Sequence, residues 1–283
     1  MIPSKVLVVG AAGQLGSAMV RRLERETSVV GMSRRDLDLR NHASVHARVS
    51  AERPDLIINC AAYNAVDQAE DAIAEALAVN TFAPQSLARA ARAVGATLVH
   101  YSTDFVFDGG TSRPYTELDR PNPQSVYGQS KLMGEWLAAD APRAFVLRVE
   151  SLFGGPAARS SIDRIIASLR SGEAARVFVD RVVTPSYVDD VIEATWALVL
   201  GNAAPGLYHV VNAGETTWHA LGEEAARLLG CPPRLVPVNV ADVPMRAPRP
   251  RYCALSIEKL RASGIAMPTW QDALARYVRS LPS

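Results

Sequence analysis

Short runs of apolar, β-branched residues alternate with longer alanine-rich stretches along the first half of the chain. The apolar runs predict strands at Val6–Val9, Ser28–Gly31, Leu56–Asn59, Thr97–Ser102 and Ala144–Val149. The longer stretches have helical periodicity and predict helices over Leu15–Arg25, Ala43–Glu52, Ala69–Val94 and Val126–Ala138. Strands that read as continuous Val, Ile and Leu are buried on both faces, so this alternation predicts a parallel sheet covered by helices on each side.

The alternation becomes less regular after Ser151. One more strand and helix, Arg176–Val183 and Asp189–Leu200, fit the earlier pattern, so residues 176–204 are expected to return to the first domain. Residues 151–175 and 205–283 are expected to form a smaller α/β cap, with Pro- and Arg-rich loops around Pro244–Pro250. The predicted fold is α/β: a Rossmann-type doubly wound parallel sheet in residues 1–150, with a smaller C-terminal cap that binds substrate.

Composition excludes several classes of protein. Apolar residues make up 48% of the chain and its formal net charge is +1, so a sizeable core is possible and no nucleic-acid partner is indicated. No apolar run is long enough to span a membrane. The three cysteines are widely spaced and the histidines lack a metal-binding spacing, so we expect no disulfide framework, no metal site and a cytoplasmic location.

A glycine-rich turn follows the first predicted strand, with Gly10, Gly13 and Gly16 three residues apart. In such a turn the first glycine permits a sharp bend, the second leaves room for a pyrophosphate, and the third lets the helix pack close to the strand. The N-terminus of that helix offers free N–H groups to the phosphates. Glycine turns also occur for packing alone, but this one opens the first βα unit, which favours a dinucleotide site.

Tyr127 and Lys131 lie four residues apart, and therefore on one face of a predicted helix. A phenol with a pKa of about 10 is a poor proton donor at neutral pH, and a nearby fixed cation lowers that pKa. The lysine can also hold the nicotinamide ribose. The chain has only Lys5, Lys131 and Lys259 as lysines, so an accidental surface pair at this spacing is disfavoured.

Thr103 follows the strand Thr97–Ser102, and ligands in doubly wound folds bind beyond the carboxyl ends of the strands. Its hydroxyl is therefore a candidate to hydrogen-bond a substrate carbonyl. A hydroxyl that merely caps a strand is the alternative, and the Tyr127–Lys131 pair decides against it.

The sequence Ser33-Arg34-Arg35 lies just past the second predicted strand. A cation at this point can bind the 2′-phosphate of NADPH, whereas an acidic residue would hold the ribose 2′-OH of NADH. Asp36, about twenty residues beyond Gly16, supports NADH but lies further past the strand end. We therefore expect NADPH as the cofactor, with NADH possible.

With these residues identified, the chain resembles the extended short-chain dehydrogenase/reductase superfamily, and within it the dTDP-4-dehydrorhamnose reductase family. The resemblance covers nearly the whole chain. It is carried by G-A-A-G-Q-L-G at 10–16, L-D-L at 37–39, P-D-L-I-I-N-C-A-A-Y-N-A-V-D-Q-A-E at 54–70, V-N at 79–80, H-Y-S-T-D-F-V-F-D-G at 100–109, P-x-x-x-Y-G-x-S-K at 123–131, G-L-Y-H-V at 206–210, T-T-W at 216–218 and R-P-R-Y-C-A-L at 249–255.

This resemblance implies reduction of C4 of a nucleotide-linked 6-deoxy-4-ketohexose by NAD(P)H, with dTDP-4-dehydro-L-rhamnose or a close analogue as the substrate. The implied catalytic residues are Thr103, Tyr127 and Lys131. The cofactor is expected to contact Gly10, Ala12, Gly13, Gln14, Leu15, Gly16, Ser33, Arg34, Arg35, Asp38, Leu39, Cys60, Ala61, Ala62, Tyr63, Asn80, Ser102, Tyr127 and Lys131. The expected substrate neighbours are Asp104, Phe105, Val106, Ser151 and Arg249.

The chain departs from the family pattern at two places. The family usually shows R-T-S-W-x-Y-G after the sixth strand, with an aromatic ring near the sugar. Here the run is Arg148-Val-Glu-Ser151-Leu-Phe-Gly154, so Ser151 takes the Trp position. Some members carry a carboxylate after the third glycine for a metal-bridged dimer, whereas this chain has Ser17-Ala18. These departures leave open which sugar is bound, and whether the protein is a monomer or a homodimer.

Two other functions are compatible with the fold. Nucleotide-sugar epimerases and 4,6-dehydratases resemble this pattern, but the dehydratases carry Thr-Asp-Glu where this chain has Thr103-Asp104-Phe105. The regulatory subunit of methionine adenosyltransferase also resembles the family and binds the cofactor without needing turnover. An intact set of Thr103, Tyr127 and Lys131 favours an enzyme.

Overall fold

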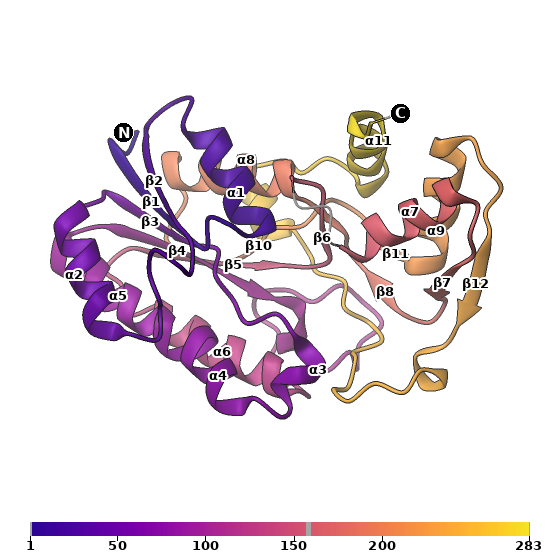
Figure 1. The fold of residues 1–283 in the computed structure, drawn as a ribbon, viewed down its shortest axis with the longest axis horizontal. Helices are drawn as coiled ribbons and strands as arrows, with labels where there is room; N and C mark the ends of the chain where they lie inside the picture. The colour runs from indigo at the N-terminus through magenta and orange to yellow at the C-terminus, as the bar shows by residue number, and fades with distance from the viewer. Residues whose placement is uncertain (1, 157–159, 283) are drawn as a thin grey trace.

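The computed structural model of the chain describes residues 2–156 and 160–282. Within these residues, six strands form one parallel sheet at the centre of the larger part of the molecule (Figure 1). Across the sheet they are ordered β10 (Gly206–His209), β5 (Ala144–Val149), β4 (Thr97–Thr103), β3 (Leu56–Asn59), β1 (Lys5–Val9) and β2 (Ser28–Met32). The predicted fold class is therefore confirmed.

Helices cover both faces of this sheet. One face carries α1 (Gln14–Leu23) and α8 (Val188–Leu200), and the other carries α2 (His42–Glu52), α5 (Ala83–Val94) and α6 (Val126–Ala138). Leu7 of β1 and Ile57 of β3 face one helical layer, while Val8 and Ile58 face the other. The central strands are thus buried on both sides, which explains their uninterrupted apolar sequence.

The order of the strands fixes where a ligand can bind. β1 pairs with β2 on one side and with β3 on the other. The chain therefore adds β2 at one side of β1 and then crosses over to add β3 at the other side. The helices that follow β1 and β3 diverge at this switch point and leave a crevice at the carboxyl ends of the strands. Val9 and Asn59, which are paired across β1 and β3, end their strands at this edge.

The predicted continuous helix over Ala69–Val94 is wrong. The structure has α3 (Val66–Ala69), α4 (Ile73–Leu77) and a π-helical turn η1 (Ala78–Phe82) before α5. Pro84 has no N–H to donate to the carbonyl of Asn80, so the regular ladder cannot pass through this point. The π-helical turn brings that carbonyl against α6, where a Cβ on Gly134 would lie only 2.0 Å from the Asn80 oxygen.

The smaller part of the molecule is built on a third apolar cluster (Figure 1). It contains the parallel pair β7 (Ala175–Phe178) and β12 (Leu235–Val238), with helices α7 (Ser161–Ser171), α9 (Trp218–Leu229) and α11 (Trp270–Ser280). The remaining elements are β6 (Leu152–Phe153), β8 (Val182–Val183), β9 (Ser186–Tyr187), β11 (Thr216–Thr217), α10 (Glu258–Ala262), and the 3₁₀ turns η2 (Asp104–Val106) and η3 (Val240–Asp242).

Two strands differ from the expected division of the chain. Residues 176–183 do not return to the main sheet, because β7 pairs with β12. Residues 206–209, expected in the cap, instead form β10 and pair with β5 at the edge of the main sheet. Both differences come from pairing between distant segments, which local periodicity does not reveal. Helix α8 does pack beside α1, and the division into a dinucleotide-binding domain and a cap stays a proposal with these changes.

No helix in the described ranges has the length and apolar character needed to cross a membrane.

Candidate active site

The glycine-rich turn connects β1 to α1 at the switch point. Gly10 has a φ of +80°, and a Cβ at this residue would lie 2.7 Å from the Ala61 nitrogen, so only glycine fits. A Cβ on Gly16 would lie 2.3 Å from the Gly10 oxygen, so Gly16 allows close packing and does not itself line a cavity. Gly13 is the N-cap of α1 and has no side chain to cap it, which leaves the first N–H groups of the helix free for an anion.

A cavity of about 360 Å³ opens beside this turn. Of the expected cofactor residues it is lined by Gly10, Ala12, Gly13, Ser33, Arg34, Asp38, Leu39, Cys60, Ala61, Ala62 and Tyr63. Arg40 also lines it and pairs with Asp38 at 2.7 Å, which lowers the pKa of the Asp38 carboxyl to about 2. Arg35 does not line it, and the Asp36 carboxylate accepts hydrogen bonds from the N–H and hydroxyl of Ser33.

Asn80 was expected to contact the cofactor, but the structure places it behind the cavity wall. Its side chain accepts from the Tyr63 N–H at 2.8 Å and donates to the Tyr63 carbonyl at 3.1 Å. It also donates to the Ser130 hydroxyl at 3.0 Å. Asn80 therefore fixes a lining residue and helix α6 from behind, and touches neither cavity directly.

A second cavity, of about 430 Å³, continues from the turn toward the cap. Of the predicted residues it is lined by Gly13, Gln14, Leu15, Cys60, Ala61, Ala62, Ser102, Thr103, Asp104, Phe105, Tyr127, Lys131 and Ser151. The three predicted catalytic residues thus meet in one cavity that also borders the glycine turn. Val106 lies in the core and Arg249 pairs with Asp67 at 2.7 Å, so neither of these expected substrate neighbours lines the cavity.

Tyr127 and Lys131 are carried by α6, whose first turn is capped by the Ser125 hydroxyl accepting from the Gly128 N–H at 3.1 Å. The Tyr127 hydroxyl donates to the Asn64 side chain at 3.4 Å. Burial lowers the pKa of the Lys131 ammonium to about 8, and burial raises the pKa of the Tyr127 phenol. The expected lowering of the Tyr127 pKa by Lys131 is not seen, because the Lys131 ammonium donates to the Tyr101 carbonyl instead. The Thr103 hydroxyl is the group that opposes the rise of the phenol pKa.

Thr103 ends β4 and is held in place by its neighbours. Its hydroxyl donates to the Asp104 carboxylate at 2.9 Å and accepts from the Phe105 N–H at 3.2 Å. The Phe105 ring meets the Tyr127 ring edge-on, with 5.5 Å between centroids. The phenol and the threonine hydroxyl are therefore fixed at one end of the cavity by aromatic packing and by η2.

The cap contributes residues that were not predicted. Arg164, Arg181 and Trp218 line the larger cavity, and a neighbouring cavity of about 330 Å³ shares them and adds Arg176. Three guanidinium groups thus surround one end of the space, a pattern typical of phosphate recognition. The motif T-T-W, which carried the resemblance at 216–218, contained the signal for Trp218. The three arginines all lie within residues 164–181, on and just after α7 and β7, where no spacing marks them as ligands.

Comparisons with known proteins agree with this geometry. Residues 4–282 match the family described as RmlD substrate binding domain. A dTDP-4-dehydrorhamnose reductase of Streptomyces griseus is 37% identical over 283 residues, covering 97% of this chain and 93% of the relative. A probable dTDP-4,6-dihydroxy-2-methyloxan-3-one 4-ketoreductase of Streptomyces antibioticus is 38% identical over 275 residues, covering 95% of this chain and 92% of the relative.

The solved structure of a dTDP-4-dehydrorhamnose reductase from Bacillus anthracis in complex with NADP superposes with a TM-score of 0.94. It is 30% identical and covers 99% of this chain and 100% of that chain. The chain belongs to the RmlD substrate-binding-domain family, which confirms the predicted family, and it is an NAD(P)-dependent oxidoreductase.

Proposed function

We propose that this enzyme reduces the C4 keto group of a nucleotide-linked 6-deoxy-4-ketohexose, with dTDP-4-dehydro-L-rhamnose or a close analogue as the substrate. The observation that carries the proposal is the cavity that joins Thr103, Tyr127 and Lys131 to the glycine turn on one side and to the cap on the other. A proton donor, a dinucleotide site and a phosphate-binding end in one space fit carbonyl reduction of a nucleotide sugar.

The residues at the turn fit a dinucleotide. The uncapped N-terminus of α1 supplies N–H groups for the pyrophosphate, and the smaller cavity has room and apolar walls for an adenosine. Arg34 and Arg40 line its outer end, and this supports NADPH in preference to NADH because a guanidinium suits the 2′-phosphate. The B. anthracis structure contains NADP, and other solved structures of similar fold contain NAD.

When bound, the nicotinamide cofactor would supply the hydride that adds to the carbonyl carbon. Tyr127 donates its phenolic proton to the developing alkoxide. Thr103 hydrogen-bonds the same oxygen and also stabilises the phenolate that remains, consistent with its lowering of the phenol pKa. Lys131 holds the ribose, and its charge favours the phenolate once the ammonium is drawn away from the Tyr101 carbonyl.

The cap is proposed to hold the nucleoside diphosphate. Arg164 and Arg176 are exposed and offer bidentate donors to phosphate oxygens, while the buried Arg181 adds positive charge beside them. The Trp218 ring offers a flat apolar surface. The Trp218 indole N–H is buried and has no hydrogen-bond partner among the described residues, so an acceptor on a ligand would satisfy it.

Two finer proposals concern the state of the protein. The described cysteines are all free thiols, which supports a cytoplasmic location. We also propose a monomer or a homodimer, in keeping with the absence of a carboxylate at Ser17 and Ala18.

The test is an assay of NADPH oxidation with a panel of dTDP-linked 4-keto-6-deoxy sugars. The proposal predicts oxidation of NADPH by at least one of them and a product reduced at C4. NADPH binding without oxidation by any member of the panel would instead identify a regulatory module. Exchange of stereochemistry or loss of water without net NADPH consumption would identify an epimerase or a dehydratase.

A further inference from the structure

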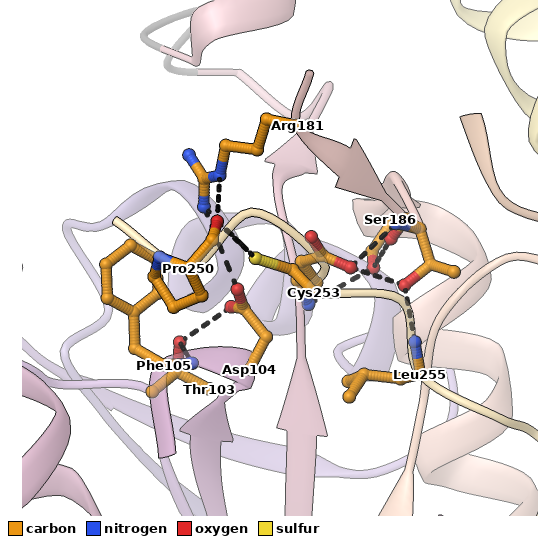
Figure 2. Close-up of polar contacts among 10 residues, drawn as sticks. Thr103, Asp104, Phe105, Arg181, Ser186, Pro250, Cys253 and Leu255 are labelled. Atoms are coloured by element: carbon orange, nitrogen blue, oxygen red, sulfur yellow. Dashed lines mark hydrogen bonds and ion pairs between the residues drawn. The ribbon is translucent and has the colours of Figure 1, made fainter. Parts of the chain in front are cut away.

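Two buried carboxyl groups lie directly behind Thr103. Asp104 follows β4 and Glu150 follows β5, and these residues are 3% and 2% exposed. Oδ2 of Asp104 and Oε1 of Glu150 are buried and have no hydrogen-bond partner among the described residues. One carboxylate oxygen of Asp104, one carboxylate oxygen of Glu150 and the sulfur of Cys253 all lie within 4.8 Å of one another. Figure 2 shows Asp104 and Cys253 facing each other, with Arg181 beside them.

The charges around this pair do not balance if both carboxyls are ionised. Arg181 is the cation that contacts the pair, with its Nη2 atom 3.9 Å from Asp104 Oδ2 and 3.6 Å from the Cys253 sulfur. Two carboxylates and one guanidinium would leave an uncompensated negative charge in the interior, which is costly. Arg181 compensates one of the two negative charges, and one proton retained by the pair would neutralise the other.

The proton belongs on Glu150. Burial raises the pKa of both carboxyls, and that of Glu150 to about 8. For Asp104, the Arg181 guanidinium and the Thr103 hydroxyl oppose this rise. For Glu150, the nearby Asp104 charge adds to the rise, while the Thr184 N–H at 2.7 Å and the Thr184 hydroxyl at 2.5 Å, both donating to Oε2, and Arg181 oppose it. Oε1 has no hydrogen-bond partner among the described residues and is free to carry the proton.

The other groups that face Glu150 do not compete for this proton. Ser186 of β9 accepts from the Glu150 N–H at 3.4 Å. Burial raises the pKa of the Cys253 thiol well above its ordinary value, so it stays neutral. The Tyr252 hydroxyl donates to Glu215, and its pKa is raised by burial and by that carboxylate. Asp104 and Arg181 are therefore the charged groups that decide the state of Glu150.

A chain of polar groups connects this pair to the active site. Asp104 Oδ1 accepts the proton of the Thr103 hydroxyl at 2.9 Å, and Thr103 lines the same cavity as Tyr127 and lowers its pKa. The groups follow one another in the order Glu150, Asp104, Thr103 and Tyr127: the first two approach within 4.8 Å, the Asp104–Thr103 step is a hydrogen bond, and Thr103 and Tyr127 line one cavity. Each can give or accept a proton.

We propose that Asp104 and Glu150 hold one proton between them and return it to Tyr127 through the Thr103 hydroxyl after each reduction. This inference rests on the proposed function. Tyr127 loses its proton to the substrate oxygen. Glu150 then passes its proton to the Asp104 carboxylate, Asp104 passes a proton to the Thr103 oxygen, and Thr103 gives its own hydroxyl proton to the phenolate. The pair, now two carboxylates, regains one proton from water. Glu150 touches no substrate in this scheme and acts through its neighbours.

The first experiment observes the shared proton without any activity. Infrared difference spectra of the cofactor-free protein are recorded between about pH 6 and about pH 10, where ordinary carboxyls do not titrate. We expect the carbonyl band of a protonated carboxylic acid to disappear at the alkaline end. The band should be absent from Glu150→Gln and retained in Asp190→Asn, a buried carboxylate paired with Arg276 outside the site. Parent protein without this band would overturn the proposal.

The second experiment measures proton return. Glu150→Gln keeps the size, the acceptor for Thr184 and a donor toward Asp104, but it cannot release a proton. We expect its kcat for keto-sugar reduction to fall about tenfold at neutral pH, less than the roughly 100-fold of a lost direct proton donor because Glu150 acts through its neighbours, while its Kd for NADPH stays within about twofold. The difference in kcat between Glu150→Gln and the parent should shrink above pH 8, because Glu150 of the parent then loses its proton as well.

A merely structural role would lower kcat equally at all pH values, and that result, or an unchanged kcat, would overturn the proton return. Failure of the parent to reduce any keto sugar would instead count against the proposed function, and the infrared bands would still decide whether the pair holds a proton.

Discussion

The ammonium of Lys131 donates a hydrogen bond to the carbonyl oxygen of Tyr101 at 2.5 Å. This contact ties α6 to β4 in the wall of the larger cavity, which both residues line, and Lys131 is only 2% exposed. The motif spacing correctly puts Tyr127 and Lys131 on one helix face. However, a backbone acceptor on the adjacent strand determines where the lysine points.

Burial of Lys131 predicts a specific dependence of stability on pH. Its pKa is about 8 in the folded protein and 10.5 as the ordinary value. Below pH 8 Lys131 is protonated in both the folded and the unfolded chain, and its buried charge lowers the stability of the folded protein. Between pH 8 and pH 10.5 the unfolded chain binds more protons than the folded one, so the free energy of unfolding rises with pH. The parent should therefore gain stability relative to Lys131→Met across this window, by at most about 3 kcal/mol. Denaturant unfolding at several pH values tests this, and parallel curves for the two proteins would refute it.

Arg34 is expected to select the cofactor. Arg34 lines the smaller cavity, whereas the adjacent Arg35 does not, so the two arginines form a matched pair. Arg34→Ala should weaken NADPH binding by roughly 10- to 100-fold, the range of one charge-assisted hydrogen bond, and leave NADH binding nearly unchanged. Arg35→Ala should change neither. Titration of both cofactors by fluorescence measures this; an equal loss for NADH in Arg34→Ala would exclude a role at the 2′-phosphate.

Ser151 predicts relaxed discrimination between sugars. It lines the larger cavity with a φ of +46°, and its small side chain offers no ring against the hexose face. We expect kcat/KM values for dTDP-4-dehydrorhamnose and its epimers to lie within about tenfold of one another, because few contacts separate them. Steady-state assays with the substrate panel give these ratios. Selectivity above about a thousandfold would mean that other residues read the sugar.

The contact between Asn80 and Gly134 should be essential for positioning α6. A Cβ on Gly134 would lie 2.0 Å from the Asn80 carbonyl, and backbone cannot yield as a side chain can. Gly134→Ala should destabilise the protein by more than about 2 kcal/mol and reduce activity together with it. In the control Gly222→Ala, the new Cβ meets only the Leu235 side chain at 3.0 Å, and this variant should lose little. Thermal unfolding compares them, and equal stability of the two variants would contradict the assignment.

Local sequence was sufficient for much of this structure. The observed bounds of β3, β5 and α6 equal those predicted, because each is an unbroken segment that follows a polar residue: Asp55, Arg143 and Ser125. The glycine turn and the Tyr127–Lys131 pair were also identifiable, since their chemistry depends on spacing within a few residues. Pro84 could have indicated the break before α5, but the alanine-rich pattern around it outweighed that signal.

Long-range pairing could not be read in this way. β10 joins β5, and β7 joins β12, through contacts between segments far apart in the chain. The acidic pair behind Thr103 has the same origin, because Asp104, Glu150, Arg181 and Cys253 come from separate segments. No local pattern around Glu150 distinguishes a buried neutral acid from an exposed carboxylate.

Tyr127 is proposed to be the proton donor in carbonyl reduction, and Lys131 to assist it. Lys131→Ala should impair both turnover and NADPH binding, because the lysine serves both. Tyr127→Phe removes only the hydroxyl, and it retains the ring that packs on Phe105. The decisive measurement is the turnover of Tyr127→Phe with a reactive keto sugar at saturating NADPH, beside its Kd for NADPH. We predict a fall of at least about 100-fold in kcat with nearly unchanged NADPH affinity. Turnover close to that of the parent would show that Tyr127 is not the proton donor.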